Sequence, residues 1–496
     1  MNSHPDPKPA DPAPADPMTP SDVAAPATAE SATLRTKPNR HFPFLSRHPW
    51  VLATAIASPR TAAASSSKTS QQKKQRTHEK QDGSLAASDG AIQSSPADQT
   101  PGDVDDLAPT VGESVELLDH DGNWIARGLC NPASRLRLRL YSYSRDQEIN
   151  DALFAQRIDE AVARRRLTPA ANLSSAGERL IFSESDRISG LIVDRYADCL
   201  SIQFTAAALL SRGPFLIEEV LKAAEKYNTP CARVIARVDA ATARHEGITA
   251  EQIAEVESWS RGISSPPVTG AGESSEVISS EEDTVWYHHN DLEMAIDLRD
   301  GQKTGGYLDQ QANHAEAARY MSGRRVLDIC TYTGGFALAA AQGGASEVIG
   351  VDSSEKALEM ARRNARKNSL DQVQFERADC FDDLKARGTR KETFDAVILD
   401  PPRFAGARRQ VDAALRAYGR LNMSALDLLP PGGILVTCSC SGHVSRADFL
   451  NMLVDAGRKR QRDIVILQSR GPSPDHPCAV SCPESDYLKC VIAQVQ

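Results

Sequence analysis

The chain has 496 residues, enough for two or three domains, and its 41% hydrophobic and 25% charged residues are typical of a soluble globular protein. The formal net charge of −9 excludes a chain that is basic overall, although a local basic patch can still bind nucleic acid. Ten cysteines are too irregularly spaced for a disulfide scaffold, which favours reduced thiols in the cytoplasm, and the absence of a run of about 18 apolar residues predicts no membrane span.

The N-terminal part of the chain divides into three segments by composition. Residues 1–38 are rich in Pro, Ala, Asp and Thr and lack the apolar core of a signal peptide, so we expect a disordered tail. Residues 40–60 bring aromatic residues and an apolar run, which predicts a strand. Residues 61–109 return to Ser, Gln and charged residues, which predicts a disordered insertion.

Two β patterns follow the insertion. The stretch "GESVELLDHDGNWIARGLCNP" alternates around a DHDGN turn and predicts a β-hairpin. In "RLRLRLYSYS" (135–144) Arg and Leu alternate, so one strand face is apolar and the other presents Arg135, Arg137 and Arg139. Two interpretations of that arginine face stay open: a solvated strand surface, or a surface that contacts phosphates.

The middle region, 146–295, mixes helices and strands and carries no obvious chemistry of its own. "INDALFAQRIDEAVARRRLTP" and "GPFLIEEVLKAAEKYN" predict helices. "RLIFSESDRISGLIVDRYADCLSIQF" predicts three strands, and "ARVIARVD" predicts a fourth. Residues 258–283 are rich in Ser, Pro, Gly and Glu and predict a loop.

From about residue 323 strands and helices alternate regularly. The predicted strands are "RRVLDIC", "SEVIGVD", "VQFERAD", "FDAVILD", "GGILVTCSC" and "DIVILQS". The predicted helices are "GGFALAAAQGG", "SSEKALEMARRNARKNS" and "VDAALRAYGRLNMSALDLL". Continuous apolar strands separated by amphipathic helices predict a doubly wound α/β domain with a mostly parallel, Rossmann-like sheet.

Ligands of such sheets bind beyond the carboxyl ends of the strands, and four predicted strands end in an acid: Asp328, Asp352, Asp379 and Asp400. Asp352 suits the two hydroxyls of a ribose, and Asp379 suits the amine of an adenine. Taken singly, each acid could instead cap a helix. The first turn has only an adjacent glycine pair and no G-x-G-x-x-G, so a pyrophosphate cofactor is disfavoured and a cationic one, S-adenosylmethionine, is favoured.

The segment "ILDPPRF" (398–404) is more specific than the acids alone. A carboxylate followed by two prolines makes the backbone rigid where a planar base could dock. Methyltransferases that act on base nitrogens or on a cytosine carbon use such a segment. The alternative is an ordinary turn at the end of a strand.

These motifs together resemble a known family, the PUA-domain-containing class I S-adenosylmethionine-dependent 23S rRNA (cytosine-5) methyltransferases. The matching stretches are "RHPWV", "GNWIARG", "ESDRISGLIVDRY", "GQKTGGYLDQQANH", "YTGGFALAAAQGGASEVIGVDSSEKALEMARRN", "FDAVILDPPRF", "CSCSG" and "DHP…YLK". The resemblance implies a PUA-like domain (39–145) interrupted by the 61–109 insertion, a middle α+β domain (146–295) and a methyltransferase domain (296–496). Family members lack such an insertion, so its role is open.

The resemblance also implies site residues. The catalytic residues would be Cys440 and Asp400, with no metal. The residues implied for S-adenosylmethionine are Lys303, Thr304, Tyr307, Asp328, Thr331, Thr333, Gly334, Gly335, Asp352, Ser353, Asp379, Asp400 and Pro401. Asp309 would hold the segment that closes over the cofactor.

The two cysteines of "CSCS" are expected to differ in role. Carbon 5 of cytosine attacks a methyl group only after a thiolate has added to carbon 6, so such an enzyme needs a reactive cysteine. Cys438 and Cys440 lie two apart on a strand and share a face, but Cys440 is nearer the carboxyl end and matches the reactive cysteine of the family, whereas Cys438 suits the core. Some relatives carry a second cysteine where this chain has Arg403.

Alternatives remain for both the cysteines and the function. C-x-C is not a zinc motif, and a zinc site from His476, Cys478, Cys482 and Cys490 is the less favoured interpretation. The preferred function is formation of 5-methylcytosine in large-subunit rRNA, free or in a pre-ribosomal particle, and a homodimer is a further option. The competing hypotheses are methylation of another rRNA base such as a guanine nitrogen, a non-catalytic RNA-binding factor, and a nucleotide-dependent oxidoreductase.

Overall fold

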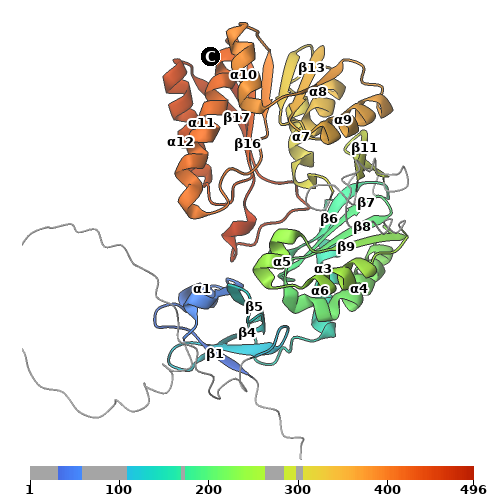
Figure 1. Ribbon diagram of the computed structural model, residues 1–496, viewed down its shortest axis with the longest axis vertical. Coiled ribbons are helices and arrows are strands. Elements are labelled where there is room, and N and C mark those ends of the chain that lie inside the picture. The colour runs from blue at the N-terminus through green and yellow to red at the C-terminus, as the bar shows by residue number, and fades with distance from the viewer. Residues whose placement is uncertain (1–31, 58–108, 169–173, 263–283, 298–304) are drawn as a thin grey trace, which may run out of the picture. The chain divides into compact units, whose positions relative to one another are not determined.

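The computed structural model describes residues 32–57, 109–168, 174–262, 284–297 and 305–496, which form three sheets with their helices and a separate hairpin (Figure 1). Most of the expected tail, 1–38, and of the expected insertion, 61–109, lies outside the described residues. None of the helices in the described ranges combines the length and the apolar character needed to cross a bilayer.

The N-terminal sheet has five strands in the order β1-β3-β4-β5-β2. Its elements are β1 (Thr33–Arg35), α1 (Phe42–Leu45), β2 (Trp50–Leu52), β3 (Ser114–Leu118), β4 (Trp124–Cys130) and β5 (Leu136–Ser142). The hairpin predicted around DHDGN is confirmed as β3 and β4, which pair antiparallel. The inner face packs around Val51, Leu117 and Leu138, each with no exposed surface.

One prediction about the start of the chain is wrong, and another is confirmed. Residues 33–35 fall in the expected tail but form β1, which pairs parallel with β3. Residues 40–60, expected to hold a strand, contain the short strand β2 after helix α1, and β2 lies at the sheet edge opposite β1. A three-residue strand is held by pairing with a neighbour distant in sequence, so the local composition does not reveal it.

The arginine face of "RLRLRL" is not a continuous phosphate-contacting surface. Arg139 is 8% exposed, and its guanidinium bonds Glu246 at 3.2 Å and the Thr205 carbonyl at 3.0 Å. Arg137 donates to the Pro132 carbonyl. Arg139 is therefore neutralised inside the fold, where a buried guanidinium needs a carboxylate partner.

The middle region forms a four-stranded sheet in the order β6-β7-β8-β9, with β8 and β9 parallel and the other pairs antiparallel. Its elements are α3 (Asp151–Arg165), β6 (Gly177–Phe182), β7 (Leu191–Tyr196), β8 (Cys199–Phe204), α4 (Gly213–Lys226), β9 (Arg233–Arg237), α5 (Ala240–Glu246) and α6 (Ala250–Ser258). The predicted helices and strands of this region are present. The hairpin of β10 (Thr284–His289) and β11 (Leu292–Asp297), which the sequence did not suggest, packs against β6, β7 and α9 (Glu355–Lys367).

The C-terminal sheet has seven strands in the order β14-β13-β12-β15-β16-β18-β17. The strands are β12 (Arg325–Ile329), β13 (Glu347–Asp352), β14 (Val373–Arg377), β15 (Ala396–Leu399), β16 (Ile434–Ser439), β17 (Ile464–Arg470) and β18 (Lys489–Val495). The first five in this order are parallel, and β18 pairs antiparallel with both β16 and β17. The predicted doubly wound, mostly parallel sheet is confirmed, and β18 is the strand that the sequence pattern missed.

Helices cover both faces of this sheet. They are α7 (Gln311–Ala318), α8 (Gly335–Gln342), α9, α10 (Cys380–Thr389), α11 (Val411–Leu428) and α12 (Arg446–Arg460). One buried cluster joins α7 and α8 to the sheet, and another joins α10, α11 and α12 to its other face. β15 lies between these layers, so all four of its residues are buried and apolar.

Short 3₁₀ turns complete the described elements. They are η1 (Ala53–Ala55), η2 (Ser183–Asp186), η3 (Ala207–Arg212), η5 (Leu308–Gln310), η6 (Arg408–Gln410) and η7 (Pro483–Ser485). η5 matters for function because it follows the "GQKTGG" segment and leads directly into α7.

Candidate active site

The sheet order brings the predicted acids and Cys440 to one edge. β12 is flanked by β13 and β15, and β15 is followed by β16, so these four parallel strands end side by side. Asp328 lies within β12 and Asp352 ends β13, whereas Asp400 and Cys440 directly follow β15 and β16. The Asp400 amide donates to the Ile329 carbonyl over 3.2 Å, which ties the two central strand ends together.

Asp328 is a buried carboxyl with one oxygen available to a ligand. It has no exposed surface, and Thr331 Oγ1 donates to its Oδ2 over 2.6 Å. Its Oδ1 accepts no hydrogen bond from the described part of the chain. Burial raises the pKa of Asp328 to about 7, because desolvation disfavours the charged form.

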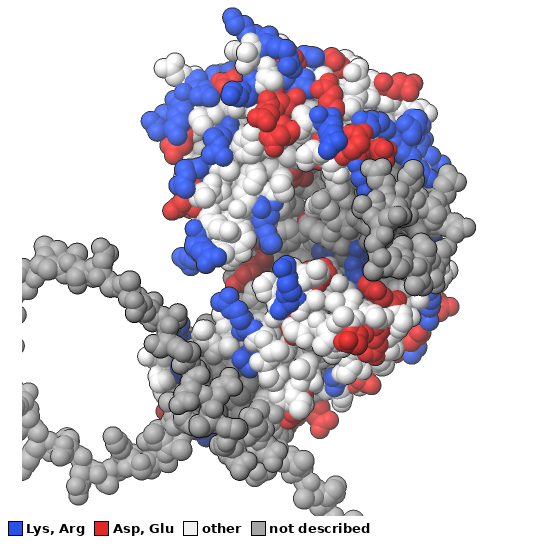
Figure 2. Space-filling model, viewed as in Figure 1, with Lys and Arg blue, Asp and Glu red and all other residues white. Residues whose placement is uncertain are grey.

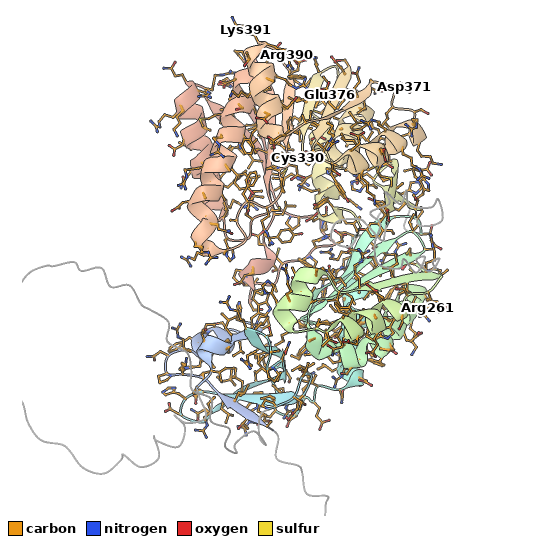
Figure 3. The ribbon with its side chains drawn as sticks, viewed as in Figure 1. Arg261, Cys330, Asp371, Glu376, Arg390 and Lys391 are labelled. Carbon is orange, nitrogen blue, oxygen red and sulfur yellow. The ribbon has the colours of Figure 1, made fainter. Side chains whose placement is uncertain are left out.

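The turn after β12 is held in a strained backbone conformation. Cys330 and Tyr332 have positive φ angles of 65° and 51°, although neither is glycine. Gly334 follows at φ 92° and caps α8, a conformation that glycine adopts without a Cβ clash. Asn364 Nδ2 bonds the Thr333 carbonyl at 3.1 Å, which holds the turn against α9, and Figure 3 labels Cys330 at its start.

Gly335 is required for a second reason, which is close packing against a histidine pair. A Cβ at Gly335 would lie 2.4 Å from His314 Cε1. His314 Nδ1 and His289 Nε2 are 2.7 Å apart, and both rings are buried. Burial lowers the pKa of both histidines, to about 4 for His289, so the pair is neutral at physiological pH.

Asp352 joins the turn to α9. Its Oδ2 accepts from the Tyr332 amide and its Oδ1 from the Ser354 amide, each over 2.9 Å. Each carboxylate oxygen has a second lone pair, and Asp352 is only half-buried, so the pair of oxygens can still accept two hydroxyls. Ser353, next in the chain, is exposed.

Asp379 is the helix cap that the sequence left as an alternative. It is exposed, and its Oδ1 accepts from the amides of Phe381 at 2.8 Å and Asp382 at 3.2 Å, at the start of α10. Contact with an adenine amine stays a prediction for this residue.

Asp400 is half-buried and hydrogen-bonded to a residue the sequence did not single out. Gln310 Nε2 donates to Asp400 Oδ2 over 3.0 Å, and the next residue, Pro401, is buried.

Tyr307 contacts the Tyr332 ring edge to face, with the ring centroids 5.2 Å apart. Burial raises the pKa of Tyr307, and the nearby Tyr332, Asp400 and Cys440 raise it further.

The segment before Tyr307 is only partly described. Lys303 and Thr304 lie outside the described residues. Asp309, expected to hold this segment, is 3% exposed and accepts a hydrogen bond from the Tyr487 hydroxyl. The Ser473 amide donates to the Asp309 carbonyl over 2.8 Å. These bonds tie the segment to the loop between β17 and β18.

The two cysteines of "CSCS" have different surroundings. Cys438 is fully buried, lies opposite Cys490 of β18 and belongs to the core under α7 and α8. Burial raises the pKa of Cys438 well above that of an ordinary thiol. Cys440 is only half-buried and follows the last residue of β16, at the edge that carries the acids. Position therefore separates an inert core thiol from an accessible one.

A buried lysine lies beside Cys440. Lys489, 2% exposed, is the first residue of β18 and pairs in register with Ser439. Its Nζ donates to the carbonyls of Ser441 at 2.7 Å and Tyr487 at 2.8 Å. Burial lowers the pKa of Lys489 to about 8, and the charge of Cys440 opposes this shift.

Sequence reasoning missed two residues that contact the candidate site, Gln310 beside Asp400 and Lys489 beside Cys440. Both lie in the stretches "GQKTGGYLDQQANH" and "YLK" that carried the family resemblance. Their chemistry was not apparent because the partners are distant in sequence: Gln310 and Asp400 are 90 residues apart, and Lys489 and Ser441 are 48 apart.

The less favoured zinc interpretation is not supported, because His476, Cys478, Cys482 and Cys490 do not form one of the possible metal-binding clusters among the described residues. His476 bonds Asp475 at 2.9 Å, and Cys490 is in the core beside Cys438. Within the described ranges, Cys482 instead approaches His48 and Glu484. The Trp50 amide donates to His48 Nδ1 over 3.3 Å, and His48 Nε2 lies 3.3 Å from Glu484 Oε2.

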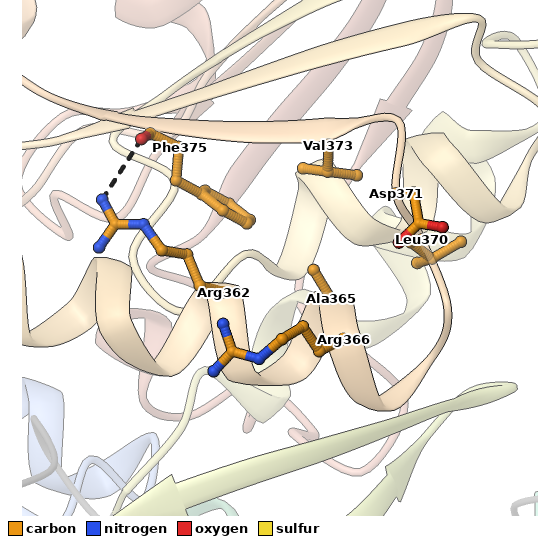
Figure 4. A pocket seen from close by; sticks show the side chains of 7 residues that line it. All are labelled: Arg362, Ala365, Arg366, Leu370, Asp371, Val373 and Phe375. Carbon is orange, nitrogen blue, oxygen red and sulfur yellow. Dashed lines mark hydrogen bonds between the residues drawn. The ribbon is translucent and has the colours of Figure 1, made fainter.

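A cavity of about 260 Å³ lies elsewhere on this domain (Figure 4). It is lined by Arg362, Ala365, Arg366, Leu370, Asp371, Val373 and Phe375. Its lining shares no residue with the predicted cofactor set, and Asp379 follows the other end of β14 from Leu370 and Asp371. Figure 2 shows Lys and Arg interspersed with Asp and Glu on the displayed face.

Comparison with known proteins agrees with this architecture. Residues 266–472 match the family model for an S-adenosylmethionine-dependent methyltransferase, and residues 73–143 match a PUA-like domain. The chain is 38% identical over 388 residues to ribosomal RNA large subunit methyltransferase I of Tolumonas auensis, covering 78% of this chain and 91% of the relative. It is 37% identical to the protein of the same name from Photobacterium profundum, covering 77% and 90%.

Solved structures show the same fold. A chain from Streptococcus mutans described as an S-adenosylmethionine-dependent methyltransferase superposes with a TM-score of 0.65 at 16% identity, over 93% of this chain and all (100%) of the other. A methyltransferase complexed with SAH superposes with a TM-score of 0.61 at 19% identity, over 78% of this chain and 92% of the other.

Proposed function

Because the chain belongs to the family of ribosomal RNA large subunit methyltransferase I, we propose that it transfers a methyl group from S-adenosylmethionine to carbon 5 of a cytosine in large-subunit (23S) rRNA. The observation that carries the proposal is the half-buried Cys440 at the end of β16, next to Asp400 at the end of β15. A methyltransferase that acts on a base nitrogen needs no thiol at this place.

The residues at the strand ends fit the cofactor. Asp328 Oδ1 is a buried acceptor that accepts no hydrogen bond from the residues the structure describes, as expected where a cationic ligand binds. Asp352 can accept the ribose hydroxyls, and Asp379 and Ser353 line the adenine side. Thr331, Thr333, Gly334 and Gly335 form the turn between β12 and α8 beside Asp328, and Gly334 permits the positive φ of this turn. Lys303, Thr304, Tyr307 and Pro401 complete the proposed set.

When bound, S-adenosylmethionine supplies an electrophilic methyl group on a sulfonium. The Cys440 thiolate adds to carbon 6 of cytosine, forming a C–S bond, and the electron pair of the C5=C6 double bond moves so that carbon 5 becomes nucleophilic. Carbon 5 would then attack the methyl group that bound S-adenosylmethionine supplies, and the donor sulfur would keep the electron pair of the broken C–S bond. A base removes the proton from carbon 5, the double bond re-forms and the Cys440 thiolate leaves.

Asp400 and Lys489 are given distinct roles in this reaction. Asp400 accepts a hydrogen bond from the exocyclic amine of cytosine and orients the ring over Cys440. Lys489 carries a positive charge beside Cys440 and favours the thiolate over the thiol. Asp400 is also the candidate for removal of the carbon-5 proton.

The test uses an rRNA fragment in which cytidine is replaced by 5-fluorocytidine. Fluorine at carbon 5 cannot leave as a proton, so the enzyme should remain covalently bound and migrate as a protein–RNA adduct under denaturing conditions. Cys440→Ala should abolish the adduct and Cys438→Ala should retain it. If the Cys440→Ala enzyme remains active, the proposal is wrong, and methylation of another base, for example at a guanine nitrogen, is favoured.

Mapping of 5-methylcytosine in rRNA from cells with and without the protein identifies the nucleotide. The same measurement on naked rRNA and on isolated large-subunit precursors distinguishes the two proposed substrates. Failure to bind S-adenosylmethionine at all would favour a non-catalytic RNA-binding factor. The homodimer and the cytoplasmic location stay predictions, which sedimentation and cell fractionation test.

A further inference from the structure

Four polar side chains form a continuous series of hydrogen bonds that ends at Asp400. Arg470, the last residue of β17, donates Nε to Oδ1 of Asn313 over 3.0 Å. Asn313 donates Nδ2 to Oε1 of Gln310 over 2.7 Å and to the Gly471 carbonyl over 3.1 Å. Gln310 donates Nε2 to Oδ2 of Asp400 over 3.0 Å. We call this series the Arg470–Asp400 chain.

The direction of the Arg470–Asp400 chain is set at its arginine end. A guanidinium only donates, so the Asn313 atom that faces Arg470 is the oxygen and the atom that faces Gln310 is the nitrogen. Asn313 is 0% exposed and Gln310 is 2% exposed, which shields both amides from bulk water. If the Gln310 amide were reversed, its NH₂ group would face the NH₂ group of Asn313, and its oxygen would face the Asp400 carboxylate. Both contacts would then lose their hydrogen bonds.

We infer that the Arg470–Asp400 chain holds the Asp400 carboxylate as a hydrogen-bond acceptor toward the target base and so selects cytosine against uracil. The inference deepens the proposed function and rests on it. Gln310, Asn313 and Arg470 are positioning residues, because each acts on the base through Asp400.

The need for such a selector follows from the chemistry of the two pyrimidines. A thiolate adds to carbon 6 of either ring, so the covalent step by itself does not distinguish them. They differ at position 4, where cytosine presents an amine that donates and uracil a carbonyl that accepts. A carboxylate held as an acceptor pairs with the amine and faces the carbonyl with like charge, and an unpaired buried polar group is costly.

Gln310→Glu tests the inference with a minimal change of shape. The new carboxyl can still accept from Asn313, but it faces Asp400 with an acceptor. The adjacent carboxyls of Glu at position 310 and of Asp400 would share one proton. Asp400 could then donate as well as accept a hydrogen bond toward the base. The measurement is kcat/KM on two RNAs that differ only by cytidine or uridine at the target position, together with the affinity for S-adenosylmethionine by calorimetry.

We expect Gln310→Glu to lower kcat/KM on the cytidine RNA by roughly tenfold to a hundredfold and the cytidine-to-uridine ratio by at least about tenfold. The affinity for the cofactor should change less than about twofold, because Gln310 acts on the base side. Gln310→Met, which removes the donor without adding charge, should lower the rate on cytidine without a gain on uridine.

Gln311→Glu is the matched control. Gln311 is the next residue, and its Nε2 donates to the Gly177 carbonyl at 2.9 Å rather than to the Arg470–Asp400 chain. The same substitution there should leave the cytidine-to-uridine ratio unchanged.

The outcomes separate the two proposals. If the wild-type protein forms no adduct with 5-fluorocytidine RNA, the proposed function fails and the inference fails with it. If the wild-type adduct forms but Gln310→Glu keeps the wild-type ratio, the inference alone is overturned. Equal loss on both RNAs in parallel with a lower Tm would likewise reduce Gln310 to a structural residue.

Discussion

The Lys489 ammonium donates a hydrogen bond over 2.7 Å to the carbonyl of Ser441, the residue after Cys440. This bond places a positive charge beside the candidate nucleophile, because Lys489 begins β18, which pairs antiparallel with β16, and β16 ends one residue before Cys440. Burial lowers the pKa of Lys489 to about 8, so the lysine is charged at neutral pH and loses its charge as the pH rises past 8. Its effect on Cys440 should therefore be visible in pH dependence.

Lys489→Met should move formation of the 5-fluorocytidine adduct to higher pH. Without the nearby cation the Cys440 thiolate is less favoured, and we expect the adduct to form about tenfold more slowly at pH 7, the equivalent of about one pH unit. Lys489→Arg keeps the charge and is the control. Quenched-flow gels from pH 6 to 9 measure the rate, and coincident profiles for wild type and Lys489→Met would contradict this role.

Lys489 should also leave a signature in stability. Its folded-state pKa of about 8 lies below the ordinary value of 10.5, so between these pH values the unfolded chain binds more protons than the folded one. The contribution of this group to the free energy of unfolding therefore rises with pH from about 8 to 10.5. Urea unfolding across this window should show a shallower rise for Lys489→Met, and equal slopes would argue that Lys489 is not desolvated.

Asp328 should make cofactor affinity depend on pH. Its pKa of about 7 means that the carboxyl is largely neutral below pH 7, whereas a cationic ligand favours the carboxylate. The affinity for S-adenosylmethionine should rise from pH 6 to 8, by at most about tenfold per unit below the pKa. Calorimetry measures this slope, and Asp328→Asn should bind more weakly with a flat profile. A wild-type affinity that is independent of pH would exclude contact with Asp328.

The ligand-free protein should show the opposite trend through the same group. The folded-state pKa of Asp328, about 7, lies above the ordinary value of 3.8, so its contribution to stability is full below that ordinary value and is lost as the pH rises through 7. Asp328→Asn should flatten this loss in urea unfolding without cofactor. An unchanged slope in the variant would assign the pH dependence to other groups.

Gly335→Ala should be strongly destabilising. The new Cβ would lie 2.4 Å from His314 Cε1, and the ring is held by its 2.7 Å contact with His289. We expect a loss of about 2–3 kcal/mol in the free energy of unfolding, as for overpacking in a buried site. Gly388→Ala in α10 is the control, since a Cβ there meets no atom within 4 Å and should be neutral or stabilising. Similar melting temperatures for the two variants would disprove the packing role.

The sequence by itself determined the regular part of the C-terminal domain and the sheet edge at which its candidate site residues lie. Buried strands such as β15 appear in the sequence as continuous apolar runs. The residue that follows each run in the sequence must lie at the end of that strand, so its place in the sheet can be predicted. Asp328, Asp352, Asp400 and Cys440 could thus be assigned to one sheet edge, and Cys440 could be separated from Cys438 by position along β16.

Only the tertiary structure decided which distant residues complete the site. β18 enters antiparallel between β16 and β17 and carries Lys489 to Cys440, and η5 with α7 carries Gln310 to Asp400. β1 and the burial of Arg139 were hidden in the same way. The physical reason is that periodicity reports which face of a segment is apolar, whereas strand order and hydrogen-bond partners depend on how whole elements pack against each other.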